Sequence, residues 1–369
     1  MLASSVVLPR NETESTLVSI AEGPWPTVER GVLDSISAKR GDTLEQASTP
    51  LRRASVPIVS PLRYPGSKRR LAGYIQRALQ ENNLRPKLFV EPFAGGASVA
   101  LQLVSSDVVE RIGLADLDPL VSAFWKIAVF DTDWLVHQVL TIDVSLEQWR
   151  RFKYGQLRSI RERALACLFL NRTSFSGILA PSAGPIGGQQ QSSRYRLDCR
   201  FPRVTLARRI RQVGALRDRV AFVWSLPWKS TLSRITQMQK RGTLPKDVFY
   251  YFDPPFFEKA DRLYTYYFCE RDHRRLRDTI VSLNEPWILS YDCETRAAEL
   301  YAHAARGTAH VEVLYSSSSP GGTRPAKEVI ITNLERLPIE TRLWRRSEEW
   351  KNRQFTRMLS TNFPNSSPS

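Results

Sequence analysis

The sequence predicts an α/β fold with a doubly wound, mixed sheet and an inserted, mainly helical subdomain. From Pro57 onward, short apolar runs alternate with segments of helical spacing, which is typical of βαβ units. The alternation stops over residues 131–240 and resumes over 241–335, so the middle segment is expected to be an insertion into the sheet domain. Residues 1–56 and 336–369 lack the alternation and are expected to flank the fold.

The first part of the predicted sheet domain, residues 57–130, contains two strand–helix pairs that follow one helix. Apolar residues recur at helical spacing in the helical segments, and two short apolar runs lie between them. The expected elements are a helix over 71–79, strands over 87–90 and 111–115, and helices over 98–104 and 120–129. This order predicts parallel strands joined by crossover helices.

The predicted insert over 131–240 is rich in polar and basic residues. It contains an expected helix over 161–170, a loop over 171–177, a Gly/Ser/Gln-rich stretch over 183–193 and a basic run over 194–219. The sheet is then expected to continue with strands over 248–252, 286–291, 311–314 and 328–332, and with helices over 272–283 and 295–302. Outside the fold, 1–56 is expected to be a poorly ordered extension with a short helix around 33–38, and 336–369 a basic tail with a surface helix over 343–359.

The composition indicates a folded, basic protein. The net charge is +16, from 53 Lys and Arg against 37 Asp and Glu, while 42% of the residues are hydrophobic and 10% aromatic. Such a charge attracts polyanions, of which nucleic acid is the commonest, whereas no basic amphipathic helix supports a membrane surface as the partner. Because neither an apolar stretch of transmembrane length nor a signal-peptide pattern is found, a cytoplasmic protein is expected.

The cysteines and histidines do not indicate a metal site. The four cysteines are scattered without a CxxC pair, and the four histidines lack ligand spacing. His273 follows Asp272, and we interpret this pair as the start of a solvated helix rather than as a catalytic dyad. Chemistry without a metal is therefore expected.

The segment Phe93–Ser98 joins the first predicted strand to a helix of small residues. Its glycines let a ligand approach the backbone, and the helix start offers amide donors. Asp116 lies 21 residues after Gly95, at the end of the next strand, which is the spacing at which a carboxylate binds the ribose of an adenosine-type cofactor. Asp118 is expected to cap the next helix. Because the turn is neither GxGxxG nor a Walker motif, a single nucleoside with a short tail fits better than a dinucleotide or a triphosphate.

The tetrapeptide Asp253–Phe256, with the sequence Asp-Pro-Pro-Phe, follows the apolar run over 248–252. Two consecutive prolines cannot continue a strand, so the chain leaves the sheet in a stiff turn. A carboxylate, a proline carbonyl and an aromatic ring then lie at a strand's carboxyl end, where ligands of open α/β sheets bind. The two oxygens suit the hydrogens of an exocyclic amine, and the ring suits a planar substrate. Taken alone, the tetrapeptide favours an ordinary strand-to-loop turn, whereas the other motifs favour a substrate site.

Together the motifs resemble the DNA adenine methyltransferases of the alpha motif order, the family that contains the DNA adenine methylases. The resemblance covers about residues 58–335, in the family's order. The motifs that carry it are Tyr64–Lys68, Phe89–Ser98, Ala115–Asp118, Asn171–Gly177 and Asp253–Phe256. They are similar to the family's Y/W-x-G-x-K, F-V-E-P-F-x-G-x-x-S, A-D-x-N/D, N-R-x-x-Y/F-x-G and D-P-P-Y elements.

The resemblance implies a Rossmann-like methyltransferase fold, with a catalytic domain over 57–130 and 241–335 and a DNA-recognition subdomain over 131–240. It implies a site-specific, adenine-specific DNA methyltransferase that moves a methyl group from S-adenosyl-L-methionine to the 6-amino group of a flipped-out adenine. The implied cofactor-binding residues are Tyr64, Lys68, Phe93, Gly95, Asp116 and Asp253, with the methionyl carboxylate near Lys68. The implied catalytic residues are Asp253, Pro254, Pro255 and Phe256, with Phe256 in place of the more common Tyr as the ring that stacks on the base.

The resemblance also implies double-stranded DNA as a partner. The expected DNA-binding residues are Arg63, Arg172, Phe175, Ser176, Arg194, Arg196 and Arg200. Among them, Phe175 is the expected wedge into the base stack, and the arginines are expected to contact phosphates or base edges. A monomer or weak dimer is expected, with either a cognate restriction endonuclease as an indirect partner or a solitary role.

Three alternatives remain open from the sequence. The first is an acceptor other than adenine, namely the 4-amino group of cytosine or an amine of RNA, although the motif order favours adenine in DNA. The second is a catalytically silent DNA-binding relative, but Lys68, Asp116, Asp253 and Pro254 are all present, and decayed sites usually lose one such residue. The third is a dehydrogenase, which the proline pair, the basic insert and the absence of GxGxxG disfavour.

Overall fold

The computed structural model describes residues 58–63, 68–257, 265–292, 295–302, 305–315 and 324–344. All of them lie in one compact unit, Arg52–Ser369. Three predictions fall outside the described residues: the extension over 1–56 with its short helix, the role of Tyr64, and nearly all of the helix over 343–359. Among the helices that are described, none is long and apolar enough to cross a membrane.

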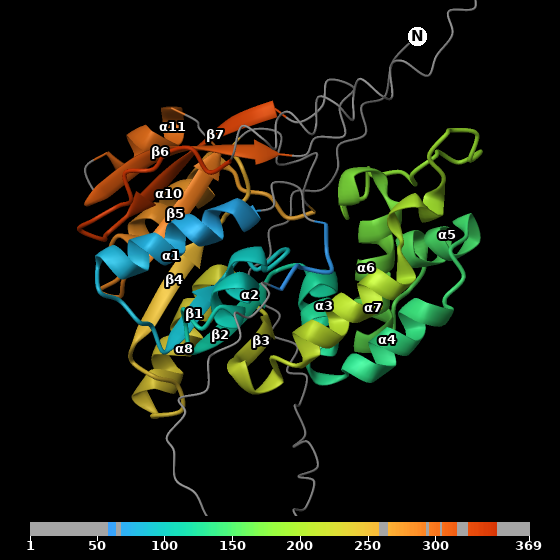
Figure 1. The fold of residues 1–369 in the computed structure, drawn as a ribbon, viewed down its shortest axis with the longest axis horizontal. Coiled ribbons are helices and arrows are strands. Elements are labelled where there is room, and N and C mark those ends of the chain that lie inside the picture. Colours follow the sequence, from blue (N-terminus) through green and yellow to red (C-terminus); the bar gives the residue numbers. More distant parts are fainter. Residues whose placement is uncertain are drawn as a thin grey trace, which may run out of the picture. The chain divides into compact units, whose positions relative to one another are not determined.

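In the described part of the chain, seven strands form one mixed sheet in the order β3-β2-β1-β4-β5-β7-β6 (Figure 1). Their bounds are β1 Leu88–Glu91, β2 Arg111–Asp116, β3 Val220–Ser225, β4 Val248–Phe252, β5 Trp287–Asp292, β6 Gly307–Tyr315 and β7 Arg324–Thr332. Strands β1 to β5 pair in parallel, whereas β7 runs antiparallel between β5 and β6. The predicted α/β class with a doubly wound, mixed sheet is confirmed.

Helices cover both faces of this sheet. The α-helices are α1 Leu71–Glu81, α2 Ser98–Ser105, α3 Pro119–Phe130, α4 Thr132–Thr141, α5 Leu146–Tyr154, α6 Ile160–Thr173, α7 Arg203–Gly214, α8 Trp228–Lys240, α10 Glu270–Ile280 and α11 Thr295–Tyr301. The short 3-10 segments are η1 Lys68–Arg70, η2 Phe175–Gly177, η3 Leu197–Arg200 and η4 Arg217–Arg219. Phe89 and Tyr251 face a cluster with α1, α2 and α3, whereas Val90 and Tyr250 face another with α8, α10 and α11. Successive side chains of a strand point to opposite faces, so β1 and β4 are buried on both.

Two helix starts show how the local sequence sets the elements. Asp118 accepts a hydrogen bond from the Leu120 N–H at 2.8 Å, and Pro119 occupies the first helical position, so the predicted cap of α3 is confirmed. At α6, Ser159 and Glu162 form a reciprocal capping box. The cap at Asp118 ends β2 sharply and keeps Asp116 at the edge of the sheet.

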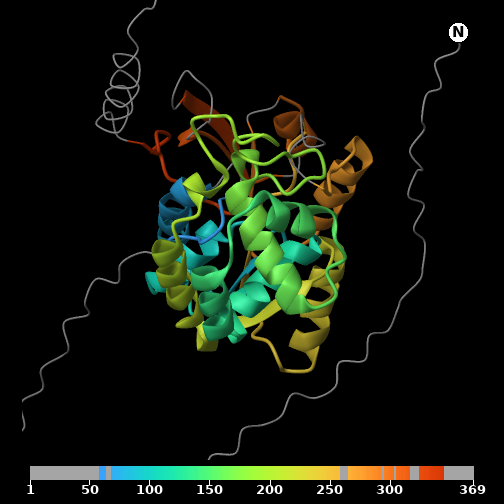
Figure 2. The ribbon, with the colours of Figure 1, turned by 90° about the vertical axis from the view of Figure 1, so that its right-hand side faces the viewer.

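The structure differs from the insert expected over 131–240. Strand β3 lies within that range and pairs in parallel with β2, and α8 follows it before β4. The separate helical region therefore ends before β3 and contains α4 to α7, which face the viewer in Figure 2. The basic run over 194–219 includes α7, which buries Leu206, Ile210 and Val213. Arginines between these residues concealed their helical spacing.

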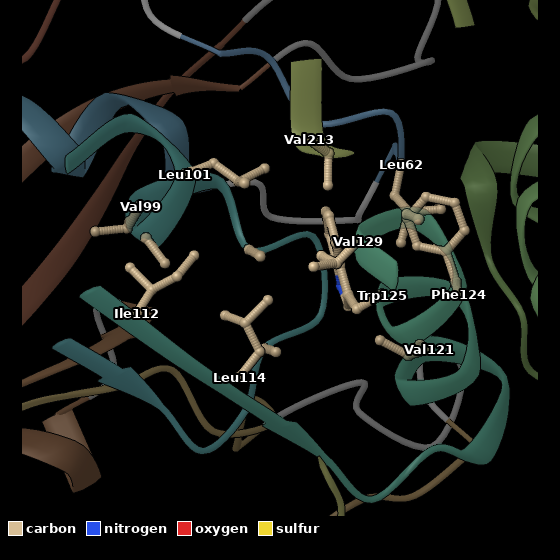
Figure 3. Packing of buried hydrophobic residues seen from close by; sticks show 14 of the residues in the cluster. Leu62, Val99, Leu101, Ile112, Leu114, Val121, Phe124, Trp125, Val129 and Val213 are labelled. Carbon is tan, nitrogen blue, oxygen red and sulfur yellow. The ribbon is translucent and has the colours of Figure 1, made fainter. Parts of the chain in front are cut away.

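A buried core ties the segment before Lys68 to the sheet domain (Figure 3). Leu62 belongs to the same apolar cluster as Phe124 of α3 and Val213 of α7, together with Leu114 of β2. Full burial of one such side chain contributes about 1.5–3 kcal/mol. This packing anchors the described segment 58–63, which precedes η1 in the sequence.

Candidate active site

A solvent-open pocket with about 930 Å³ of empty volume lies at the carboxyl ends of β1, β2 and β4. The strand order reverses between β1 and β4, which is where open α/β sheets bind ligands. The pocket brings together six of the predicted site residues, namely Lys68, Phe93, Gly95, Asp116, Asp253 and Pro255. Its wall also contains Glu91, Trp228, Tyr266 and Phe268, which sequence reasoning did not identify.

The turn after β1 is bonded to the end of β2. The Ala94 N–H donates to the Ala115 carbonyl at 2.9 Å, and the Gly95 N–H donates to Asp116 Oδ2 at 2.8 Å. The indole N–H of Trp125 donates to the Gly95 carbonyl at 2.8 Å. Gly95 has a φ of 42°, in the left-handed region that glycine adopts readily. The turn is therefore held open as a backbone cradle beside Asp116.

Asp116 shapes the pocket as well as lining it. Its Oδ2 accepts the Gly95 N–H, and its Oδ1 accepts the Asp118 N–H at 2.9 Å. Burial, with a smaller contribution from Asp118, raises the pKa of Asp116 to about 7. Each carboxylate oxygen can accept a second hydrogen bond, so the side chain retains acceptor capacity toward a ligand.

Lys68 occupies the centre of a buried charge cluster. Its Nζ lies 2.8 Å from Glu328 Oε1 of β7 and 3.3 Å from Asp253 Oδ1 after β4, with side-chain exposures of 4%, 2% and 27% for Lys68, Glu328 and Asp253. Burial by itself lowers the pKa of Lys68, but Asp253 and Glu328 raise it, and the net shift is upward. The ammonium group is therefore charged, and it also lies 5.0 Å from the centre of the Phe256 ring.

Asp253 is held through one of its two carboxylate oxygens. Oδ1 accepts a hydrogen bond from Ser290 Oγ at 3.2 Å and contacts Lys68, and Ser290 in turn lies 2.8 Å from the Tyr251 hydroxyl. No described residue bonds to Oδ2 or donates a hydrogen bond to the carbonyl of Pro254. Burial raises the pKa of Asp253, against the lowering effects of Lys68 and Ser290. Asp253 Oδ2 thus remains as an acceptor beside the pocket, whereas Pro254 is buried, and neither Pro254 nor Phe256 is among the residues that line the pocket.

Glu91 adds another carboxyl group at the end of β1. It is 3% exposed, and its Oε1 accepts the Ala100 N–H at 2.7 Å. Burial raises the pKa of Glu91 to about 8, with a smaller upward contribution from Asp253 that the Ala100 hydrogen bond opposes. The group is therefore mostly protonated at neutral pH.

His273 differs from the sequence interpretation, which placed it at a solvated helix start. It is buried on α10, stacks on Phe257 with 3.9 Å between ring centres, and its Nδ1 lies 2.8 Å from the Tyr291 hydroxyl. Burial lowers the pKa of His273 to about 4. This neutral side chain anchors the residue that follows Phe256 and thereby supports the turn.

Arg172 was expected to contact DNA, and the structure corrects this prediction. The side chain is 5% exposed, and its guanidinium donates to the Pro61 carbonyl. Next to it, Asn171 accepts the Arg63 N–H and donates to the carbonyls of Arg63 and Gly177, all within 2.8 Å. Asn171 and Arg172 are therefore internal clamps that tie the loop after α6 to the segment before Lys68.

The other expected DNA-binding residues lie nearer the surface. Phe175 is 60% exposed, Ser176 has a left-handed φ of 56°, and Arg194, Arg196 and Arg200 are exposed. Arg63 is partly buried, and burial followed by the proximity of Arg200 lowers its pKa.

An arginine cluster continues from these residues onto η1 and α7. We define it as Arg63, Arg69, Arg200, Arg208 and Arg209, which lie around the buried Arg172. Burial, followed by repulsion from Arg209, Arg63 and Arg200, lowers the pKa of Arg172 to about 9. Burial, followed by repulsion from Arg69 and Arg208, also lowers the pKa of Arg209. Within the described ranges, no ion pair joins these arginines to an acidic side chain.

Sequence reasoning missed the residues that support Asp253 from other strands. Glu91 lay inside the Phe89–Ser98 motif, and its place at a strand end was an available signal. Ser290 and Glu328 had no local signal, because only the pairing of β4, β5 and β7 brings them to Asp253. The described residues also contain no group of three His, Cys, Asp or Glu arranged to hold a metal ion.

Comparison with protein families gives a match over residues 64–202, to the family described as D12 class N6 adenine-specific DNA methyltransferase. The matched range includes Lys68, the turn after β1, Asp116 and the loop after α6, and it ends before Asp253. The family resemblance drawn from the motifs is confirmed by this match. A search of curated proteins gave no match.

Proposed function

We propose that this protein, an adenine-specific DNA methyltransferase by its D12 class domain over residues 64–202, uses S-adenosylmethionine and acts on an adenine flipped out of duplex DNA. The observation that supports this most strongly is the pocket itself. It unites the backbone cradle after β1, the Asp116 carboxylate, Asp253 and Pro255 at one edge of the sheet. A nucleoside cofactor and an amine-bearing base fit such a combination.

The charges of the pocket fit S-adenosylmethionine. Four carboxyl groups, those of Glu91, Asp116, Asp118 and Asp253, line it together with Lys68, in a chain whose net charge is +16. Asp116 suits the ribose and the turn after β1 suits a close backbone approach, while the carboxylates other than the mostly protonated Glu91 favour a ligand that carries a sulfonium and an ammonium group. When bound, S-adenosylmethionine supplies an electrophilic methyl group on a positively charged sulfur.

The turn after β4 activates the target amine. Asp253 Oδ2 and the Pro254 carbonyl oxygen accept the two hydrogens of the adenine 6-amino group, which directs the nitrogen lone pair out of the ring system. Burial raises the pKa of Asp253, so this carboxylate is also a competent acceptor for the proton that the amine loses. Catalysis then rests on positioning and electrostatics.

Access to the 6-amino group requires base flipping. An amine inside the stack cannot reach a pocket that lies at the strand ends, so the base leaves the duplex. Phe256 stacks on the flipped base, and the exposed Phe175 fills the vacated place in the stack. The DNA-recognition subdomain is α4 to α7 with the loop between α6 and η3, and the arginine cluster binds phosphates around the flipped nucleotide.

The decisive test is a matched pair of carboxylate substitutions. Asp253→Asn keeps the shape but removes the acceptor charge, and we expect methylation of adenine to fall by at least about a hundredfold while DNA affinity is largely retained. Asp107→Asn, at a surface carboxylate paired with Arg219, should leave activity unchanged. Expression of both in a host without DNA methylation, followed by sequencing of modified bases, reports the acceptor base and the target site. Equal methylation by Asp253→Asn would refute the assignment.

A further inference from the structure

We propose that Glu328 is a positioning residue, which holds Lys68 Nζ beside Asp253 Oδ1 and so reserves Asp253 Oδ2 for the target amine. The inference rests on the proposed function and goes beyond it, because Glu328 lies on β7, outside every motif and outside the matched range 64–202. Glu328 itself does not touch the substrate. It acts through Lys68.

The distances show which carboxylate binds the ammonium more closely. Lys68 Nζ makes a hydrogen bond to Glu328 Oε1 at 2.8 Å, whereas its contact with Asp253 Oδ1 is 3.3 Å. Lys68 and Glu328 are both almost fully buried, so little solvent screens the pair. The ammonium group therefore lies closer to Glu328 of β7 than to Asp253, with which it keeps a longer contact.

The position of Lys68 between Asp253 and Glu328 meets two opposing requirements on Asp253, which has to be ionised and has to keep an oxygen for the target amine. A buried lysine next to Asp253 keeps the carboxylate ionised, but a lysine bonded to it alone would compete with the target amine for its oxygens. Glu328 satisfies the ammonium from the opposite side. Asp253 thus keeps a neighbouring positive charge and a free oxygen together.

The neighbouring titratable groups contribute to the same balance. Those near Asp253 or Glu328 on the packed elements are Lys68 of η1, Glu91 of β1, Tyr251 of β4, Tyr291 and Asp292 of β5, and Glu328 itself. Lys68 is the cation among them, so changes at Lys68 and Glu328 should affect Asp253 in opposite directions. Removing Lys68 removes a stabilising charge, whereas removing Glu328 frees that charge to close on Asp253.

The alternative role for Lys68 is to bind the carboxylate of the cofactor's amino-acid tail. In that case, loss of Glu328 would misplace Lys68 for the cofactor and would appear as weaker S-adenosylmethionine binding. If Glu328 instead positions Asp253, the loss appears in the methyl-transfer step. Cofactor affinity and single-turnover rate therefore separate the two roles.

The experiment compares wild type with Glu328→Gln, Lys68→Met and the double variant, and uses Glu312→Gln as a control. Glu312 lies on the neighbouring strand β6 and pairs with Arg342 at the surface. S-adenosylmethionine affinity is measured by calorimetry, and single-turnover methylation of duplex DNA is measured against pH. We expect Glu328→Gln to lower the rate constant by about tenfold to a hundredfold with less than about a threefold change in cofactor affinity, and Glu312→Gln to match wild type.

The acidic limb of the pH profile gives the second readout. It should move to lower pH in Glu328→Gln and to higher pH in Lys68→Met. In the Lys68→Met background, Glu328→Gln should cause no further loss of rate, because Glu328 positions Asp253 only through Lys68. The double variant also avoids an unbalanced ammonium group, so it tests the inference even if the single Glu328 variant folds poorly.

Several outcomes would overturn the inference. The first is a methylation rate and an acidic limb of the pH profile that stay unchanged in Glu328→Gln, and the second is acidic limbs that move in the same direction in the two single variants. The third is a loss of rate in the double variant that equals the sum of the two single losses. The fourth is a loss in Glu328→Gln that is confined to cofactor affinity. A wild-type protein that does not methylate DNA would instead refute the proposed function. The two failures are therefore distinguishable.

Discussion

At Lys68, burial and charge act in opposite directions. Desolvation disfavours the ammonium form, and the carboxylates of Asp253 and Glu328 more than offset it. The three residues come from η1, the turn after β4 and strand β7, so their contact depends on the completed sheet. Such a cluster is expensive to break in part and less so to remove as a whole.

The stability of this cluster can be measured with the same variants. Lys68→Met leaves Glu328 and Asp253 without their cation, and we expect the free energy of unfolding to fall by about 3–5 kcal/mol. Adding Glu328→Gln should recover part of that loss, because the uncompensated buried charge is removed. Denaturant unfolding of the cofactor-free proteins measures both changes. A double variant less stable than Lys68→Met would contradict the charge argument.

Glu91 makes stability depend on pH in a direction opposite to that of most carboxylates. Its pKa is about 8 in the folded protein against an ordinary 4.5, so the folded state binds more protons between these values. The contribution of Glu91 to the free energy of unfolding is therefore greatest below about pH 4.5. This contribution is lost as the pH rises through 8. We expect Glu91→Gln to remove this decline, at roughly 1.4 kcal/mol per pH unit within the window. Unfolding midpoints across the window, compared between wild type and variant, measure the difference.

Individual residues could be predicted from sequence where a local motif fixes their place. Gly95, Asp116 and Asp253 each end a strand or lie in the turn after it, and the pocket contains all three. Arg172 shows the opposite case, because an arginine in a basic protein looks like a DNA contact until its burial against Pro61 is known. Glu328 could not be predicted at all, since its partner is found only through the antiparallel insertion of β7.

At the scale of elements, the loop after α6 is the joint between the helical region and the active site. Gly177 has a φ of +77°, and a Cβ atom there would lie 2.4 Å from the Arg63 carbonyl oxygen and 3.2 Å from that of Asn171. The backbone of η2 therefore approaches the segment before Lys68 as closely as glycine permits. This contact holds the loop that carries Phe175 against the segment 58–63, which precedes Lys68 in the sequence.

A glycine pair tests this joint. Gly177→Ala should lower the free energy of unfolding by more than about 1 kcal/mol and reduce methylation, because both the left-handed φ and the close carbonyl oppose a Cβ atom. Gly184→Ala, in the same loop region with no atom within 4 Å of its Cβ position, should stay within about 0.5 kcal/mol of wild type. Thermal unfolding and methylation rates measure the pair, and equal behaviour of the two variants would disprove the role of this contact.

The elements themselves differed in how well sequence predicted them. Strand β4 has the predicted bounds of 248–252, because an apolar run meets two prolines and both ends are marked. The insert expected over 131–240 included strand β3 and helix α8, because the basic run before them obscured the point at which the sheet strands resume. A parallel edge strand with a polar last residue carries a weak signal, and its identity follows from pairing with β2.

At the scale of the whole molecule, positive and negative charge are separated. The chain has a net charge of +16, yet the pocket is lined by carboxyl groups around Lys68. The arginine cluster lies on η1, η3 and α7, and on the segment before η1 that contains Arg63. Because Lys68 and Arg69 are adjacent in η1, the two regions meet at that segment. A cationic cofactor and a polyanionic substrate are thus attracted to neighbouring but different surfaces.

Two triple variants separate the effect of where positive charge lies from the effect of total charge. Arg69→Gln, Arg200→Gln and Arg208→Gln together remove three charges from the arginine cluster, and Arg271→Gln, Arg274→Gln and Arg275→Gln remove three from the exposed side of α10. The first set has no acidic partner within the described ranges, whereas Arg274 pairs with Glu270 and Arg275 with Asp272. Both triple variants therefore have the same net charge.

If the cluster contacts phosphates, each lost contact reduces the slope of log affinity against log salt concentration by about 0.9. We expect the cluster variant to lose up to about three such units and the α10 variant almost none, as measured by fluorescence anisotropy of labelled duplex DNA over a salt series. S-adenosylmethionine affinity should be the same in both variants, because neither set lines the pocket. Equal slopes in the two variants would mean that overall charge, and not this surface, brings DNA to the enzyme.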